Sequence, residues 1–284
     1  MTDTTPPAPR DAGLLRPVSA RAKGVVDPAT AQRTFRLNRY EPAPDLAAVL
    51  DYHWIVEWDL RGQPDFVQRT LPYPVVNIVF DAELTAVFGV VSGAYEHRLT
   101  GANRALGLRF RPGGFRALLK RGLHTITDVH LPLSAVLPVD DAEAERAVLG
   151  QPDDAGMIAA AEAMLRPLLG PPDPKVDRLN AILALAQNDP ALTRVDELAE
   201  RAGVGMRALQ AWFSDYIGVS PKWVIRRYRL HEAADQLAHG ADLDLADLAQ
   251  RLGYYDQAHF TRDFSRLVGR PPQAYRRPAA APPR

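Results

Sequence analysis

The last third of the chain repeats one spacing of apolar residues, first over Val195–Gly203 and again over Leu245–Gly253. In both copies the apolar residues follow an i, i+3, i+4, i+7 spacing, which places them on one face of an α-helix. Both copies end in glycine, which suits the left-handed conformation that terminates helices. The matching apolar positions are Val195, Leu198, Ala199 and Ala202 in the first copy and Leu245, Leu248, Ala249 and Leu252 in the second.

A second helical stretch follows each of these glycine turns and closes at another glycine, Gly218 or Gly269. A helix, a tight turn and a second helix form the helix-turn-helix plan. We expect Thr193 to cap the first unit in a capping box and Asp256 to cap the second helix of the later unit. The apolar anchors of the second helices are Leu209, Phe213 and Ile217 in one unit and Phe260, Phe264 and Leu267 in the other.

Residues Pro221–Leu237 lie between the two units, and their pattern predicts one amphipathic helix. This helix begins at a proline, a residue suited to a first helical turn. Its apolar residues alternate with basic ones, and its length suits it to hold the two units at a fixed separation. The apolar set is Val224, Ile225, Tyr228 and Ala233, and the basic set is Arg226, Arg227, Arg229 and His231.

The front of the chain predicts strands, so the fold class expected for the whole chain is α+β. The clearest domain boundary is the Pro- and Gly-rich linker Gly170–Lys175. We expect a flexible arm at 1–30, a mostly β front domain at 31–170, a helical domain at 171–277 and a flexible tail at 278–284. The expected strands are His53–Trp58, Val67–Leu71, Val75–Phe80, Ala86–Ser92 and Leu106–Phe110; the expected helices are Phe115–Lys120, Asp140–Leu149 and Ala155–Leu169.

Composition narrows the class of protein without identifying it. The chain has no cysteine, which excludes disulfide frameworks and thiol catalysis and fits a reducing cytoplasm. We expect no secretion signal and no membrane span, because apolar runs such as Ala86–Val91 are too short. The net charge is zero, although residues from Lys175 onward carry 16 basic and 13 acidic side chains. This charge balance permits DNA binding and does not argue for it.

The region from about Leu179 to Arg277 resembles the DNA-binding domain of the AraC/XylS family of bacterial transcription regulators. The resemblance covers about a hundred residues and not the front domain. It implies two recognition helices in successive major grooves. The matching motifs are Ala202-Gly203, Leu209 with Phe213, Gly218-Val219-Ser220-Pro221, Arg229-Leu230-His231-Glu232-Ala233, Leu248-Ala249, Gly253-Tyr254, Phe260 with Phe264, and Gly269-Arg270-Pro271-Pro272-Gln273-Ala274-Tyr275-Arg276.

In such units the solvent face of the second helix reads base edges. With the apolar anchors inward, the first unit turns Arg207, Gln210, Ala211 and Ser214 outward, and the second turns Gln257, Ala258, His259, Thr261 and Arg262 outward. In the family that this region resembles, the position that corresponds to Arg262 usually carries an arginine. Phosphate contacts would come from helix N-termini and from Lys222, Arg226, Arg227 and Arg270. For Lys222, Arg226 and Arg227 an ordinary solvated helix face is an equally good interpretation.

The first unit departs from the family pattern at two positions. Gly205 stands where a capping serine is expected, and Ala211 stands where relatives often carry a basic reader. Specificity should therefore depend more on the second unit. A ligand- or protein-binding adaptor with a degenerate DNA-binding domain stays open as an alternative.

The front domain offers only weak candidates for a ligand site: His53, Trp54, Arg109 and Arg111. Arginines inside a β cavity can bind an anion, although outward-facing strand arginines are commoner. Neither a phosphate loop nor a nucleophile elbow nor a metal-ligand spacing occurs, so we expect no enzyme activity, no cofactor and no metal. The expected partner is double-stranded DNA, with RNA polymerase, a small-molecule effector and a second copy of the chain open as further partners.

Overall fold

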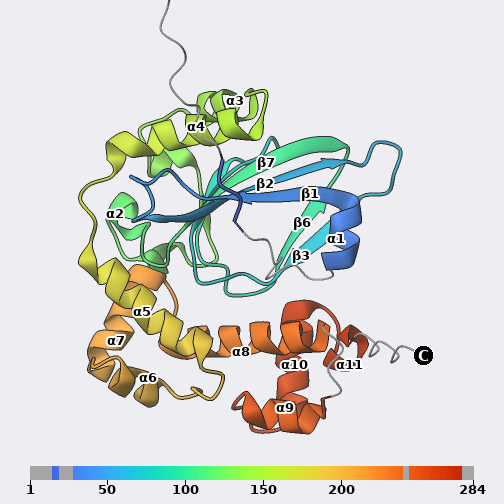
Figure 1. Cartoon of the computed structure of the whole chain (residues 1–284), viewed down its shortest axis with the longest axis vertical. Helices are drawn as coiled ribbons and strands as arrows, with labels where there is room; N and C mark the ends of the chain where they lie inside the picture. Colours follow the sequence, from blue (N-terminus) through green and yellow to red (C-terminus); the bar gives the residue numbers. More distant parts are fainter. Residues whose placement is uncertain (1–14, 19–27, 239–242, 277–284) are drawn as a thin grey trace, which may run out of the picture.

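The computed structural model describes residues 15–18, 28–238 and 243–276, and it places a β-rich part beside a helical part (Figure 1). All named strands lie between Phe35 and Leu131, and every named element from Pro174 onward is a helix. The α+β fold class is therefore confirmed. The predicted tail 278–284 and most of the predicted arm lie outside the described residues.

Six strands form one antiparallel sheet in the order β1-β2-β7-β4-β5-β8, and β3 pairs with β6 in a second, two-stranded sheet. The longest pairing joins β2 to β7, from Leu50 opposite Phe110 to Asp59 opposite Ala102. The strands are β1 (Phe35–Tyr40), β2 (Leu50–Asp59), β3 (Phe66–Thr70), β4 (Asn77–Phe80), β5 (Ala86–Phe88), β6 (Tyr95–Leu99), β7 (Ala102–Phe110) and β8 (His130–Leu131).

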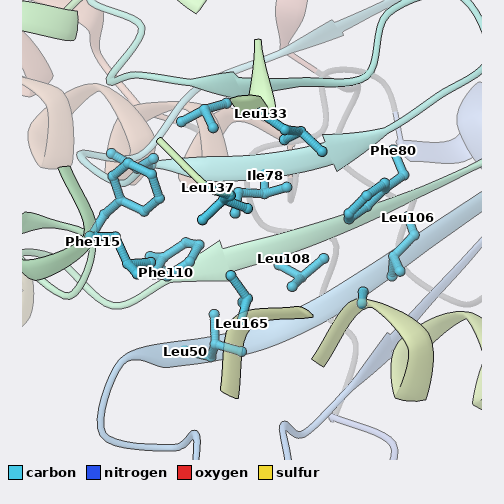
Figure 2. Close-up of a cluster of buried hydrophobic side chains, with 14 of the residues drawn as sticks. Leu50, Ile78, Phe80, Leu106, Leu108, Phe110, Phe115, Leu133, Leu137 and Leu165 are labelled. Carbon is cyan, nitrogen blue, oxygen red and sulfur yellow. The ribbon is translucent and has the colours of Figure 1, made fainter. Parts of the chain in front are cut away.

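One face of the six-stranded sheet packs against helices and forms the main core of the front domain. Leu106 and Leu108 of β7 are fully buried there, together with Leu165 at the end of α4 (Figure 2). Alternate residues of a strand point to opposite faces, so Leu106, Leu108 and Phe110 of β7 enter this core together with Leu50 and Ile55 of β2. The front helices are α1 (Pro28–Thr34), α2 (Arg116–Leu119), α3 (Asp141–Leu149) and α4 (Asp154–Leu165), with 3-10 turns η1 (Leu123–Ile126), η2 (Leu133–Ala135) and η3 (Arg166–Leu168).

The opposite face of the sheet carries aromatic and charged side chains. Tyr52, Trp54 and Arg109 lie on it and are only partly buried. The indole of Trp54 lies across the backbone of Gly107, where an added Cβ would come within 1.9 Å of the ring. Glycine at position 107 therefore leaves the room that lets Trp54 lie flat on the sheet.

The helical part has two small cores, one for each predicted unit. The first buries Leu198, Leu209 and Phe213, and the second buries Phe260 and Phe264. The helices are α5 (Pro174–Asn188), α6 (Val195–Arg201), α7 (Met206–Trp212), α8 (Pro221–Ala238), α9 (Leu245–Arg251), α10 (Gln257–Val268) and α11 (Pro272–Tyr275), with a π-helical turn η4 (Phe213–Ile217) extending α7.

Helix α8 belongs to both of these cores. Its Val224 and Ile225 pack in the first core, and its Ala233 and Leu237 pack in the second. With 18 residues it is about 27 Å long at 1.5 Å per residue. The two units are thus fixed to the two halves of one continuous helix, as Figure 1 shows.

The front domain packs on α8 and on the end of the first unit. Tyr73 stacks on His231 of α8 at 4.1 Å between ring centroids. Thr127 donates its hydroxyl hydrogen bond to Gly218 O at 2.6 Å, and Arg116 forms an ion pair of 2.9 Å with Asp215. The front domain thus covers part of the polar side of α8, at His231, as well as the end of the first unit.

The structure adds strands that the sequence patterns do not predict. Strand β1 is an edge strand in which only Phe35 is buried, so it lacks the alternation that would mark it. Strand β6 carries Glu96, His97 and Arg98 in a row of five residues. Residues 15–18 lie beside β1, with Val18 N donating to Arg39 O at 3.0 Å, so this described part of the predicted arm is attached to the sheet.

The predicted cap at Thr193 is wrong. Arg194 is the N-cap residue of α6, and no side chain caps this helix. Thr193 instead packs against the turn of the second unit, where a Cβ on Gly253 would lie 2.8 Å from its own Cβ. The predicted cap at Asp256 is confirmed, because its carboxylate accepts a hydrogen bond of 2.7 Å from His259 N.

Candidate nucleic-acid interface

Both helix-turn-helix units turn through a glycine in the left-handed region. Gly203 has a φ of +60° and Gly253 a φ of +76°. Two residues separate Gly203 from the start of α7, whereas three separate Gly253 from the start of α10. The added residue leaves Tyr255 94% exposed at the tip of the second turn. No apolar pattern marks Tyr255, and the sequence reasoning missed it.

The first recognition helix, α7 with its π-helical turn, buries Leu209 and Phe213 completely. Helical geometry then directs the residues between these anchors away from the core. The exposed residues include all the predicted readers of this helix: Arg207, Gln210, Ala211 and Ser214. The outward face therefore offers one guanidinium, one amide and one hydroxyl to a partner.

The second recognition helix, α10, buries Phe260 and Phe264 completely. Gln257, Ala258 and Arg262 are exposed, whereas His259 and Thr261 are half-buried. The left-handed Gly269, with a φ of +87°, ends this helix. Arg262 projects from the helix with no ion-pair partner among the described residues.

Gln210 and Ser214 share a hollow of about 470 Å³ with Lys222 at the start of α8. Ser220 caps α8 by accepting a hydrogen bond of 3.2 Å from Trp223 N. A helix N-terminus carries partial positive charge and free backbone N–H groups, both of which favour a phosphate. The hollow thus joins a basic side chain to a helix N-terminus beside the first recognition helix.

The two arginines in the middle of α8 are already engaged within the protein. Arg227 is 3% exposed and donates to the backbone oxygens of Ser92 and Gly93 in the front domain. Burial lowers the pKa of Arg227 to about 10. Arg226 forms an ion pair with Asp263 of α10. This placement argues against a phosphate contact for Arg227 and leaves Arg226 as a link between α8 and α10.

Arg270 follows α10 and lies over the ring of Tyr275, with 4.8 Å between Cζ and the ring centroid. Arg266, which the sequence reasoning missed, is 81% exposed on α10 and contacts Asp263 at 3.2 Å. Its position one turn beyond Arg262 on the same helix could have marked it.

The structure does not bring the four candidate ligand residues together. His53 points into the main core, where its Nε2 lies 2.8 Å from Glu162. Burial would raise the pKa of Glu162, but hydrogen bonds from His53 and from Ala43 N outweigh it and the pKa is lowered. Trp54 lies on the opposite face of the sheet and donates to Asn77 at 3.2 Å.

Arg109 and Arg111 do lie together, on the lining of one cavity between the front domain and helices α5 and α8. The sequence reasoning missed a third arginine there, Arg39, because β1 was not recognised as a strand. Within the described ranges, no group of three or more His, Asp or Glu side chains could hold a metal ion, and no helix is long and apolar enough to cross a membrane.

Two family profiles match the chain. A profile described as "Helix-turn-helix domain" matches residues 198–278, and a "Domain of unknown function (DUF6597)" matches residues 38–132. The first match covers both units, and the second covers most of the sheet.

Among curated proteins, a putative AraC-like transcription regulator of Streptomyces lividans is 34% identical over 101 residues, which are 35% of this chain and 33% of that protein. A probable transcription factor of Proteus vulgaris, PqrA, is 32% identical over 89 residues, which are 31% of this chain and 72% of that protein. The match thus spans about a third of the first relative's length. Among solved structures, the C-terminal domain of the response regulator AraT from Geobacillus stearothermophilus is 22% identical over 38% of this chain and 91% of that one, with a TM-score of 0.34.

Proposed function

Because this chain belongs to the AraC-type transcription regulators, we propose that it binds double-stranded DNA sequence-specifically and regulates transcription. The observation that carries the proposal is the pair of exposed recognition faces fixed to one helix, α8. Successive major grooves on one face of DNA are roughly 34 Å apart. Two units on a helix of about 27 Å are suited to enter two such grooves.

Base reading is assigned to the exposed side chains of the two recognition helices. Arg262 in the second unit and Arg207 in the first are suited to paired contacts with guanine, each contributing roughly 1–3 kcal/mol of discrimination. Gln210 and Gln257 are suited to adenine. The remaining residues proposed to face the bases are Ala211, Ser214, Ala258, His259 and Thr261.

Phosphate contacts are assigned to Lys222 with the N-terminus of α8, and to Arg266 and Arg270. They would set affinity and its dependence on salt, and not the preferred sequence. Arg226 and Arg227 are left out because each is already bound within the protein.

The front domain is proposed to sense a small molecule, with a cytoplasmic location for the whole protein. We keep the domain boundary at Gly170–Lys175 because the cores on its two sides share few residues. Among the described residues, the front domain contributes Leu71 and Val90 as buried members of the cores of the helical part, and Tyr73 and Ala94 pack against these cores. RNA polymerase and a second copy of the chain remain proposed partners.

A gel-shift and footprint of the full chain on its own upstream region tests the proposal. We expect a salt-sensitive complex with two protected patches one helical turn apart on the same face of the DNA. No sequence-selective complex would favour the alternative, an adaptor whose helical domain no longer reads DNA. The two internally bound arginines and the Ala211 position are the observations that favour that alternative.

A further inference from the structure

A cavity of about 360 Å³ lies between the sheet of the front domain and helices α5 and α8. Arg39, Tyr52 and Arg109 line it from strands β1, β2 and β7, and Asn180 and Tyr228 line it from α5 and α8. The two walls belong to different domains, so a molecule that fills the cavity touches both.

The lining of the cavity carries three arginines and one carboxylate, that of Asp51. The guanidinium of Arg111 already has partners within the protein, because it donates to Asp177 at 2.8 Å and to Ala48 O at 3.2 Å. Arg109 is committed through Nε alone, which donates to Asp51 at 2.9 Å. Its terminal nitrogens have no acceptor within the described ranges.

Arg39 is the least satisfied of the three. No hydrogen bond or ion pair engages its guanidinium among the described residues, and its Nη1 is buried. A buried donor without an acceptor costs free energy, and the cost is larger for a charged group. An incoming acceptor would remove that cost, so the site favours an anion.

Aromatic rings lie against the guanidinium groups of both Arg39 and Arg109. The ring of Tyr52 lies 5.7 Å from Arg39 Cζ and 5.1 Å from Arg109 Cζ. The ring of Tyr73 also lies against Arg109, with 4.7 Å between the ring centroid and Arg109 Cζ. Planar guanidinium groups placed in this way match the two oxygens of a carboxylate, since arginine binds carboxylates through paired hydrogen bonds.

We propose that this cavity binds a small organic acid, with its carboxylate on Arg39 and Arg109 and its remainder between the tyrosine rings and α8. A volume near 360 Å³ suits a metabolite at the small end of usual ligand sites, which run from about 300 to 1,000 Å³. Because the ligand would touch both the sheet and Tyr228 of α8, its binding holds the front domain on the connecting helix. This last step rests on the proposed function and makes the acid a regulator of DNA affinity.

Binding is tested on the full chain without DNA, by thermal shift and calorimetry with succinate, benzoate and inorganic phosphate at constant ionic strength. At ten times its Kd, a bound acid should raise Tm by about 3 °C. Arg39→Gln should weaken binding at least tenfold. Arg98→Gln, which removes an exposed arginine of β6 that does not line the cavity, is the matched control and should bind as the wild type does.

Equal binding by Arg39→Gln and the wild type would overturn the site. So would a failure of both carboxylates to bind, whether or not phosphate binds. Tyr228→Leu removes the ring and the hydroxyl from the wall that α8 contributes and keeps an apolar side chain there, so it tests the contact between α8 and the ligand. A weaker affinity in this variant supports a site shared between the domains, and an unchanged affinity contradicts it.

The regulatory step is tested by the affinity for DNA with and without the bound acid. Linkage requires the acid to change DNA affinity by the same factor as DNA changes the affinity for the acid. A factor of one would overturn the regulatory step while leaving the binding site. Absence of any DNA complex would instead contradict the proposed function, and the thermal shift would still report on the site.

Discussion

Arg226 of the connecting helix forms an ion pair with Asp263 in the middle of the second recognition helix. The Asp263 side chain is only 12% exposed, and its other oxygen accepts a hydrogen bond of 3.2 Å from Arg266. The pair joins α8 to α10 on the side of α10 that faces the protein. It therefore helps to set the angle at which the exposed face of α10 is presented.

Replacement of Arg226 by methionine should leave the Asp263 carboxylate short of one partner in a nearly buried position. We expect the free energy of unfolding to fall by roughly 1–3 kcal/mol, the range for a buried acceptor that loses its donor. Urea denaturation measures this change. Arg98→Met, which breaks the exposed pair with Asp65, is the control and should cost less than about 1 kcal/mol. Equal losses would mean that the Arg226 pair behaves as an ordinary surface pair.

Arg262→Ala should remove one base contact from the second unit. Because only one half of the site meets α10, specificity should relax there by roughly 1–3 kcal/mol at one or two base pairs and stay unchanged in the other half. Binding selection on randomised sites measures both halves at once. A uniform loss on all sequences would instead make Arg262 a phosphate contact.

Ala211→Arg should add a basic reader to the first recognition helix. Position 211 is exposed between the buried anchors Leu209 and Phe213, so a longer side chain fits without repacking. If the new guanidinium meets a phosphate, the slope of log affinity against log salt should steepen by about 0.9. Ala211→Gln is the uncharged control. An identical slope in all three proteins would indicate that the side chain at position 211 does not meet a phosphate.

His97 should make the stability of the front domain depend on pH. Its Nε2 lies 3.3 Å from Oδ2 of the buried Asp81, and this hydrogen bond raises the pKa of His97 above its usual value of about 6.5. A raised folded-state pKa stabilises the protein below the unfolded-state pKa, and the stabilisation is lost as pH rises through the folded-state value. Urea unfolding at pH 6 and pH 8.5 should show this loss in the wild type. His97→Gln should reduce the difference, and an undiminished difference would assign it to another group.

The helical part could be predicted closely because its signals are local. The left-handed glycines 203, 218, 253 and 269 and the cap at Asp256 each depend on a few neighbouring residues. The recognition faces follow from the buried anchors by helical periodicity alone. Thr193 is the exception: Arg194 is the N-cap residue, and Thr193 lies against Gly253 of the second unit, a neighbour 60 residues away in the sequence.

The front domain could be predicted only in part, because its contacts join distant segments. Val75–Phe80 and Leu106–Phe110 were found as strands since their residues are mostly apolar. Strand β1 was missed because an edge strand with Arg36, Asn38 and Arg39 has no apolar alternation. The same error hid Arg39, and with it the charge of the cavity. Likewise, nothing in the pattern of α8 shows that Arg227 would be bound by the backbone of a loop 134 residues earlier.

Because α8 belongs to both cores, its length fixes the separation of the two helix-turn-helix units and the rotation of one unit relative to the other. Each inserted residue would turn the second unit by about 100° relative to the first and move it about 1.5 Å along the axis. A single insertion in the middle of α8 would therefore turn α10 away from the face of the DNA that α7 meets, even if both units stayed folded. An insertion of seven residues would nearly restore the rotation but would lengthen the helix by about 10 Å. The length of this one helix therefore determines the spacing of the two half-sites.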